Sequence, residues 1–212
     1  MAHERVYLDQ YETPAWVFDR LYDAIGDQLD QVRGGRWLEP AAGRGALIRA
    51  VSARLSTPPR WTAVEIDPAR RGELLALDPA PEEVCTMDFR DFAQREAARV
   101  PAAGTRPFDV AITNPPFLLA LEYVLAARLI ARRVILLLRQ AFLESTERSA
   151  FLRRACPDSY VLPERPSFRT DTSGVDKYSY SWFVWGDRDQ PHGRVQVLGT
   201  TPVSVRKGAR RN

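Results

Sequence analysis

The sequence has few cysteines and no long apolar run. The two cysteines, Cys85 and Cys156, lie in no motif with metal-ligand or disulfide-framework spacing, so we expect no metal site and a reducing, cytoplasmic location. No uninterrupted apolar stretch approaches the roughly 20 residues that span a bilayer, and residues 1–5 lack the apolar core of a signal peptide. We therefore expect no membrane partner.

Lysine is also scarce, because Lys177 and Lys207 are the only two in a chain of 212 residues. The net charge is nevertheless +3 with a pI of about 9.1, so arginine carries nearly all the positive charge. Arginine suits phosphate groups and base edges, although a G+C-rich genome gives the same bias without a functional reason. The charge therefore favours a polyanionic partner only weakly.

The length and composition predict one globular domain over residues 1–212. With 45% hydrophobic and 27% charged residues, a chain of this size can bury one substantial core. Within the domain we expect an N-terminal helix over 14–33, a core over 36–186 and a basic tail over 200–212, whose residues 206–212 we expect to be mobile.

An apolar run at 110–112 predicts a buried strand that breaks at residues 114–117, Asn-Pro-Pro-Phe. Neither proline can donate to a sheet ladder, and each keeps its predecessor out of the helical region. We therefore expect a rigid turn, called here the proline corner, at the carboxyl end of a strand, where open α/β sheets bind ligands. Its carbonyl oxygens can accept hydrogen bonds from a planar amino group, and its phenyl ring can stack on the ring that carries this amine. An ordinary strand-ending turn is the alternative.

Residues 36–48 have the pattern of a strand, a glycine-rich turn and a helix. Gly43 and Gly45 allow a tight turn and a close approach by a ligand. A dinucleotide-binding turn would need a third small residue where Ile48 stands, and a phosphate loop would need Gly-Lys-Ser/Thr. Glu39 instead lies at the end of the strand, where it would repel a pyrophosphate and attract a cationic or hydroxyl-rich ligand.

Acidic residues also end the next two expected strands. Glu65 ends a strand over 61–65, where it can accept hydrogen bonds from ribose hydroxyls. Asp88 follows a short strand over 84–86 and can accept from an adenine amino group, with Phe89 packing on the ring. Each acid alone is more simply explained as a solvated strand end or a helix cap. Acids at three successive strand ends, with a glycine turn at the first, favour one shared ligand site.

The remaining elements complete an α/β pattern. Thr13 as N-cap and Pro14 at the first helical position begin the N-terminal helix. Later in the chain we expect helices over 118–131 and 147–155, and strands over 134–138, 159–162 and 178–185. Alternating strands and helices followed by a hairpin imply a mostly parallel sheet of seven strands, with one antiparallel strand and helices on both faces.

Four fragments in this order resemble a known family. They are residues 39–45, 64–68, 87–89 and the proline corner at 114–117. Their order and their places at successive strand ends are similar to those of the S-adenosylmethionine-dependent amino-methyltransferases, specifically the N6-adenine DNA methyltransferases whose cofactor motifs precede Asn-Pro-Pro-aromatic. The resemblance covers residues 11–186 and implies a Rossmann-like class I methyltransferase fold.

The resemblance implies a role for each matching residue. The catalytic residues would be Asn114, Pro115, Pro116 and Phe117. The implied cofactor, S-adenosylmethionine, would be bound by Tyr11, Thr13, Pro14, Glu39, Pro40, Ala41, Gly43, Gly45, Glu65, Ile66, Asp88, Phe89 and Asn114. Residues 165–168 and 182–185 are similar to the hairpin of small phage-type adenine methyltransferases, which makes Phe168 a candidate second face for the target base. The base and its nucleic acid would be contacted by Phe117, Phe168, Arg165, Arg169 and Lys177.

The implied reaction is direct in-line transfer of a methyl group to the N6 amine of adenine in DNA. Hydrogen bonds from that amine to the Asn114 side chain and the Pro115 carbonyl would aim its lone pair at the methyl group. Neither cysteine lies in a matching motif, which argues against a cytosine-C5 mechanism. No separate target-recognition domain follows the last expected strand, so we expect short or relaxed sequence specificity, or dependence on a partner.

Three other functions stay open. Methylation of adenine in RNA is the nearest, because Asn-Pro-Pro-aromatic enzymes without a recognition domain also act on RNA. N5-methylation of a protein glutamine uses similar amide chemistry, but such relatives usually carry a helical domain ahead of the glycine turn, and only residues 1–35 precede the first expected strand. A cofactor- or nucleic-acid-binding module without catalysis is the third. The sequence leaves the oligomeric state open, a monomer included.

Overall fold

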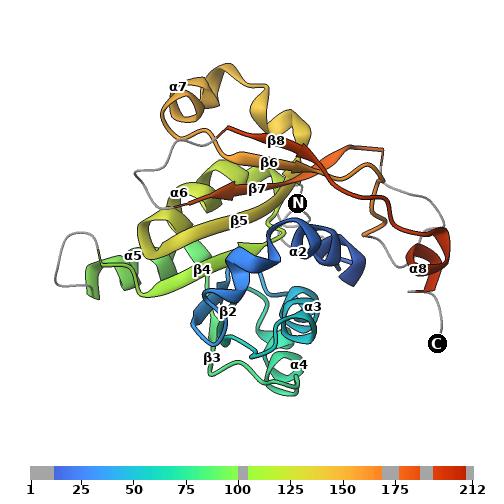
Figure 1. The fold of residues 1–212 in the computed structure, drawn as a ribbon. Coiled ribbons are helices and arrows are strands. Elements are labelled where there is room, and N and C mark those ends of the chain that lie inside the picture. The colour runs from blue at the N-terminus through green and yellow to red at the C-terminus, as the bar shows by residue number, and fades with distance from the viewer. Residues whose placement is uncertain (1–11, 100–104, 169–176, 187–192, 209–212) are drawn as a thin grey trace, which may run out of the picture.

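The computed structural model describes residues 12–99, 105–168, 177–186 and 193–208. Within these ranges eight strands form one sheet in the order β3-β2-β1-β4-β5-β7-β6-β8, with helices on both faces (Figure 1). The strands are β1 Arg36–Glu39, β2 Arg60–Glu65, β3 Glu83–Thr86, β4 Phe108–Thr113, β5 Ala131–Arg139, β6 Asp158–Val161, β7 Tyr180–Trp185 and β8 Val195–Val197. The α-helices are α2 Ala15–Asp30, α3 Ala46–Arg54, α4 Arg71–Leu75, α5 Phe89–Arg99, α6 Ala120–Ile130, α7 Thr146–Arg154 and α8 Val203–Gly208. The 3-10 helices are η1 Pro68–Arg70, η2 Phe117–Leu119 and η3 Gln140–Leu143.

The sheet is mostly parallel. Parallel pairing links β3 to β2, β2 to β1, β1 to β4 and β4 to β5, whereas β7 pairs antiparallel with β5 and with β6. Since β8 pairs parallel with β6, one strand runs against the others, as the sequence predicts. The predicted count of seven strands is wrong, because β8 adds an eighth. Its three residues are all exposed, so no buried apolar run marks them in the sequence.

The alternation of side chains along the strands supplies a core on each face of the sheet. In β4, Val110 and Ile112 pack into the core formed with α2 and α3, whereas Ala111 packs into the core formed with α5 and α6. The sequence of a parallel strand covered by helices on both faces is a continuous apolar run. This run allowed β4 to be predicted from the sequence. The prediction of helices on both faces is confirmed.

Tryptophan side chains attach α2 and α3 to the sheet. Trp182 of β7 donates its ring N–H to the Val17 carbonyl over 2.9 Å, and Trp61 of β2 donates to Ser52 Oγ over 3.0 Å. Buried indole rings with satisfied N–H groups fix the position of both helices. The start of α2 is thereby held beside the end of β4.

Several predicted boundaries differ from the structure. The N-terminal helix begins at Ala15, with Pro14 rather than Thr13 at the N-cap, and no side chain caps it. The predicted helix over 118–131 gives way to a strand without an intervening loop, because α6 ends at Ile130 and β5 begins at Ala131.

The first part of the basic tail is helical, and its mobility stays a prediction. Residues Val203–Gly208 form α8, and the Thr201 N–H donates to Glu164 Oε1 over 2.7 Å just before it. Residues 209–212 lie outside the described ranges. None of the helices in the described part of the chain is long and apolar enough to cross a membrane.

Candidate active site

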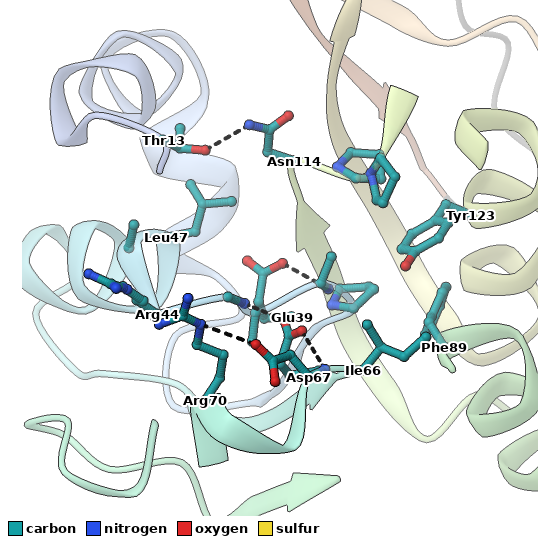
Figure 2. Close-up of a pocket in the computed structure, with 18 of the residues that line it drawn as sticks. Thr13, Glu39, Arg44, Leu47, Ile66, Asp67, Arg70, Phe89, Asn114 and Tyr123 are labelled. Atoms are coloured by element: carbon teal, nitrogen blue, oxygen red, sulfur yellow. Dashed lines mark hydrogen bonds and ion pairs between the residues drawn. The ribbon is translucent and has the colours of Figure 1, made fainter. Parts of the chain in front are cut away.

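The order of the strands reverses between β1 and β4. After β1 the chain continues to β2 and β3 on one side, and after β4 it continues to β5 on the other. At such a switch point the loops diverge and leave a crevice at the carboxyl ends of the strands. A pocket of about 380 Å³ occupies this crevice (Figure 2), a volume in the usual range for small-ligand sites.

Most of the residues singled out in the sequence meet in this pocket. Those that line it are Thr13, Glu39, Pro40, Ala41, Gly43, Glu65, Ile66, Asp88, Phe89, Asn114, Pro115, Pro116 and Phe117. They come from segments up to 104 positions apart in the chain, from Thr13 to Phe117, so the fold brings the four sequence fragments to one place.

The glycine turn after β1 is held by the acid at the end of β2. Gly43 and Gly45 have φ angles of +51° and +76°, and a Cβ on Gly45 would clash with the Leu77 side chain. Gly45 therefore shapes the turn and does not itself line the pocket. The Gly43 N–H donates to Glu65 Oε2 over 2.7 Å, and the Asp67 N–H donates to Glu65 Oε1 over 2.9 Å. Each of these oxygens keeps a lone pair for a ligand.

Glu39, at the end of β1, is a buried acid with unused acceptor capacity. Its side chain is 2% exposed, and Oε1 accepts from the Ala41 N–H over 3.3 Å. Burial raises the pKa of Glu39 well above its usual range, and the nearby Glu65 charge acts in the same direction. The Thr113 side chain lies close enough to the carboxylate to lower this pKa in part, although Oε2 makes no hydrogen bond of good geometry among the described residues. A cationic ligand would satisfy this oxygen and stabilise the charged carboxylate.

Asn114 follows β4 at the proline corner, and a residue from the start of the chain fixes its amide. Nδ2 donates to Thr13 Oγ1 over 3.1 Å, which explains why Thr13 does not serve as a helix cap (Figure 2). Oδ1 is buried and has no partner among the described residues. The Pro116 carbonyl accepts from the Leu119 N–H over 2.9 Å and so begins η2. The corner thus holds an oriented amide oxygen that lacks a donor.

The far side of the pocket carries an acid and two aromatic rings. Arg90 binds the Asp88 carboxylate through its Nε at 3.0 Å and its Nη2 at 2.7 Å, and this hydrogen bonding lowers the pKa of Asp88. Phe89 is buried, with its ring centroid 5.0 Å from that of Tyr123. Burial, followed by the charges of Asp88 and Glu65, raises the pKa of Tyr123, so its hydroxyl stays neutral at the pocket wall (Figure 2).

Phe168 does not lie where the sequence suggested. It is 2% exposed and packs edge to face on Tyr180, with 4.9 Å between ring centroids, and it does not line the pocket. Tyr180 in turn contacts Phe117, with centroids 5.4 Å apart. The apolar ring is buried in the core rather than displayed on the loop, so we correct its assignment from a second base-stacking face to a support behind Tyr180.

The other predicted residues fall outside the pocket wall. Pro14 begins α2, and Arg165 and Lys177 are exposed on the surface without lining the pocket. Tyr11 and Arg169 lie outside the described residues, so the structure does not place them.

No family model matches the chain. A Listeria monocytogenes protein assigned to the class I S-adenosylmethionine-dependent methyltransferases is similar in structure, with a TM-score of 0.60 at 13% identity, over 90% of this chain and 68% of that one. The fold is that of the class I methyltransferases. At 13% identity the likeness concerns the fold alone.

Two further proteins of similar structure differ in length. The methyltransferase subunit of a type I restriction-modification system from Streptococcus thermophilus matches with a TM-score of 0.58 at 16% identity, over 84% of this chain and 45% of that one. This chain therefore spans less than half of that subunit. A Pyrococcus horikoshii protein assigned as an RNA methyltransferase matches with a TM-score of 0.58 at 18% identity, over 86% and 87% of the two chains.

Some residues of the pocket were missed in the sequence. These are Glu12, Ala42, Arg44, Ala46, Leu47, Asp67, Arg70, Met87, Leu118, Tyr123 and Arg139. Arg139 ends β5, so the rule that picked out acids at strand ends would have found it, had it been applied to cations. Tyr123 lies in an apolar helix, where an aromatic residue gives no signal that separates it from the core.

Proposed function

We propose that this chain is an S-adenosylmethionine-dependent methyltransferase that transfers a methyl group directly to the N6 amine of adenine in DNA. The proposal rests on the hydrogen bonding of the Asn114 side chain. Its amide nitrogen is engaged by Thr13, and its amide oxygen is a buried acceptor without a partner in the described structure. A buried acceptor left unpaired costs about 1–3 kcal/mol, so the site favours a ligand that donates a hydrogen bond there. An exocyclic amine is such a ligand.

The wall of the pocket supports the cofactor assignment. S-adenosylmethionine, when bound, supplies a methyl group activated by an adjacent positive sulfur. Glu39 is a buried carboxyl group in the pocket wall and suits the positive charge of this ligand. Glu65 keeps lone pairs for hydroxyls, and Asp88 and Tyr123 line the same pocket and could contact an adenine ring.

The proline corner supports the target assignment. Asn114 Oδ1 and the Pro115 carbonyl can accept the two hydrogens of a planar amine, whereas the Pro116 carbonyl already accepts from Leu119. Phe117 lines the pocket beside them and can stack on the base, which contributes about 1–3 kcal/mol. A rigid corner also reduces the entropy lost when the amine is oriented.

An adenine in RNA is the second candidate. One observation favours it: the match to the assigned RNA methyltransferase covers 87% of that protein, whereas the match to the restriction-modification subunit covers 45%. The site chemistry is the same for both, because the base and its amine are identical.

The test is incubation of the protein and S-adenosylmethionine with plasmid DNA and, separately, with total RNA, followed by mass spectrometry of the nucleosides. We expect N6-methyladenine in DNA. Its appearance only in RNA would select the second candidate. A protein that binds the cofactor but methylates neither polymer would contradict the proposal and favour a binding module or a protein substrate.

A further inference from the structure

Of the described residues, three arginines line the pocket, and they differ in their partners. Arg44 lies 3.3 Å from Glu73, and Arg70 lies 2.7 Å from the same carboxylate and 3.6 Å from that of Asp67, so both guanidinium groups have carboxylate partners within the protein. Arg139 lies within ion-pair distance of no carboxylate in the described part of the chain, although its side chain is only partly exposed. Among the described residues, its charge therefore has no carboxylate partner at the edge of the pocket.

Two aromatic rings hold the Arg139 guanidinium. Its central carbon lies 4.7 Å from the centroid of Phe117 and 3.7 Å from that of Tyr178. Both rings lie within the range of cation–π attraction. The Gln140 N–H also donates to the Ser179 carbonyl over 3.0 Å, which ties the end of β5 to the segment that carries Tyr178. The guanidinium is thus aligned beside the proline corner.

The guanidinium also has an unused donor. Arg139 Nε is buried and has no hydrogen-bond partner among the described residues. A buried donor without a partner is unfavourable, and for a charged group the cost is larger than for a neutral one. A planar cation with a free N–H and no carboxylate partner among the described residues fits a phosphate, whose oxygens accept from a guanidinium in a bidentate manner.

We propose that Arg139 binds a backbone phosphate of the nucleic acid whose base enters the pocket, and so positions that base on Phe117. This inference rests on the proposed function for the identity of the base. In the complex the guanidinium moves onto the phosphate and leaves the ring of Phe117 to the base, while Tyr178, the nearer ring, keeps it aligned. Arg139 is a positioning residue, since it does not touch the reacting amine.

Binding of a fluorescein-labelled single-stranded DNA, measured by anisotropy at several salt concentrations with S-adenosylhomocysteine present, tests the proposal. Arg139→Gln should weaken binding about tenfold at low salt, and it should lower the slope of log affinity against log salt by about 0.7, because one phosphate contact is lost. Arg132→Gln, the same substitution at an exposed position near the other end of β5, should leave the slope unchanged. An oligonucleotide with uncharged methylphosphonate linkages should bind the wild type and Arg139→Gln equally.

Equal salt slopes for the wild type and Arg139→Gln would overturn the inference, and so would equal losses in Arg139→Gln and Arg132→Gln. Thermal unfolding and cofactor affinity of each variant show whether it folds as the wild type does. If the slope falls as expected but no nucleic acid is methylated, the proposed function fails and the phosphate site stands. If methylation occurs and the slope does not change, the proposed function stands and the phosphate site fails.

Discussion

The two sides of the pocket are built differently. On the glycine-turn side, formed by Glu39, Gly43, Glu65 and Asp67, the hydrogen bonds join residues that are close in sequence, 2 to 22 positions apart. On the proline-corner side, formed by Asn114, Phe117 and Arg139, the contacts reach much further, and Asn114 pairs with a residue 101 positions away. The first side is a local structure that its sequence encodes, and the second exists only after the sheet and α2 have assembled.

Because of this difference, substitutions on the two sides should alter different properties of the protein. Changes on the glycine-turn side should alter the affinity for a small ligand, whereas changes on the proline-corner side should alter turnover. A single variant that altered both the affinity for the small ligand and the turnover would contradict this distinction between the two sides.

The largest effect is expected for Asn114→Ala. Loss of the amide oxygen removes the acceptor that orients the amine, and loss of one such preorganised group typically costs about 100- to 1,000-fold in turnover. The affinity for S-adenosylmethionine should stay within about threefold, on the scale of one weak contact. Single-turnover methylation and calorimetric titration measure the two quantities. Turnover near the wild-type rate would refute the role of Asn114.

Glu39→Gln should act on the other side of the pocket. Without the carboxylate charge, the affinity for S-adenosylmethionine should fall about tenfold or more, as expected for a hydrogen bond to a charged group. Turnover at saturating cofactor should change much less. Asp27→Asn, which removes an exposed acid of α2 away from the pocket, is the matched control and should leave both values unchanged. Equal affinities for Glu39→Gln and the wild type would remove Glu39 from the site.

Thr13→Val should reduce turnover about fivefold, because it removes one neutral hydrogen bond worth about 1 kcal/mol that fixes the Asn114 amide. Thr13→Ser keeps the hydroxyl and should restore the rate. The affinity for the cofactor, measured by titration, should not change in either variant. A Thr13→Val enzyme with wild-type turnover would show that Asn114 is held without this long-range contact.

More of the glycine-turn side than of the proline-corner side could be predicted from the sequence. The glycine turn and the acids Glu39, Glu65 and Asp88 were readable, because each stands at the end of an apolar strand run and its contacts are local. Thr13 was predicted as a helix cap and, from the resemblance, as a cofactor contact, since nothing in residues 11–14 reveals a partner just after β4. Phe168 was placed on a base for the same reason, because its packing on Tyr180 depends on how β7 lies beside β5.

Phe168→Leu tests that correction and should have a modest effect. A roughly volume-conserving change in a core costs about 1 kcal/mol or a little more in the free energy of unfolding. The KM for the nucleic acid should stay within about twofold of the wild type. Denaturant unfolding and steady-state kinetics measure these values. A large rise in KM with unchanged stability would return Phe168 to the base-binding face.

The smallest effect is a pH dependence of stability without the cofactor. The pKa of Glu39 is raised in the folded state, so the folded protein binds its proton more tightly and loses stability as pH rises from the unfolded value of about 4.3 toward the folded one. Glu39→Gln lacks this loss. Its melting temperature should exceed that of the wild type at neutral pH, and the difference should vanish below about pH 4. The two melting temperatures are measured by calorimetry across this pH range. A difference that did not depend on pH would contradict a raised pKa of Glu39.

The position of a bound cofactor product tests the central claim most directly. A crystal structure of the protein with S-adenosylhomocysteine should place the sulfur in the pocket between Glu39 and Asn114, with the side from which a methyl group would project facing the amide oxygen. A sulfur on the far side of Glu65, or a ligand bound outside the pocket, would contradict methyl transfer at the proline corner.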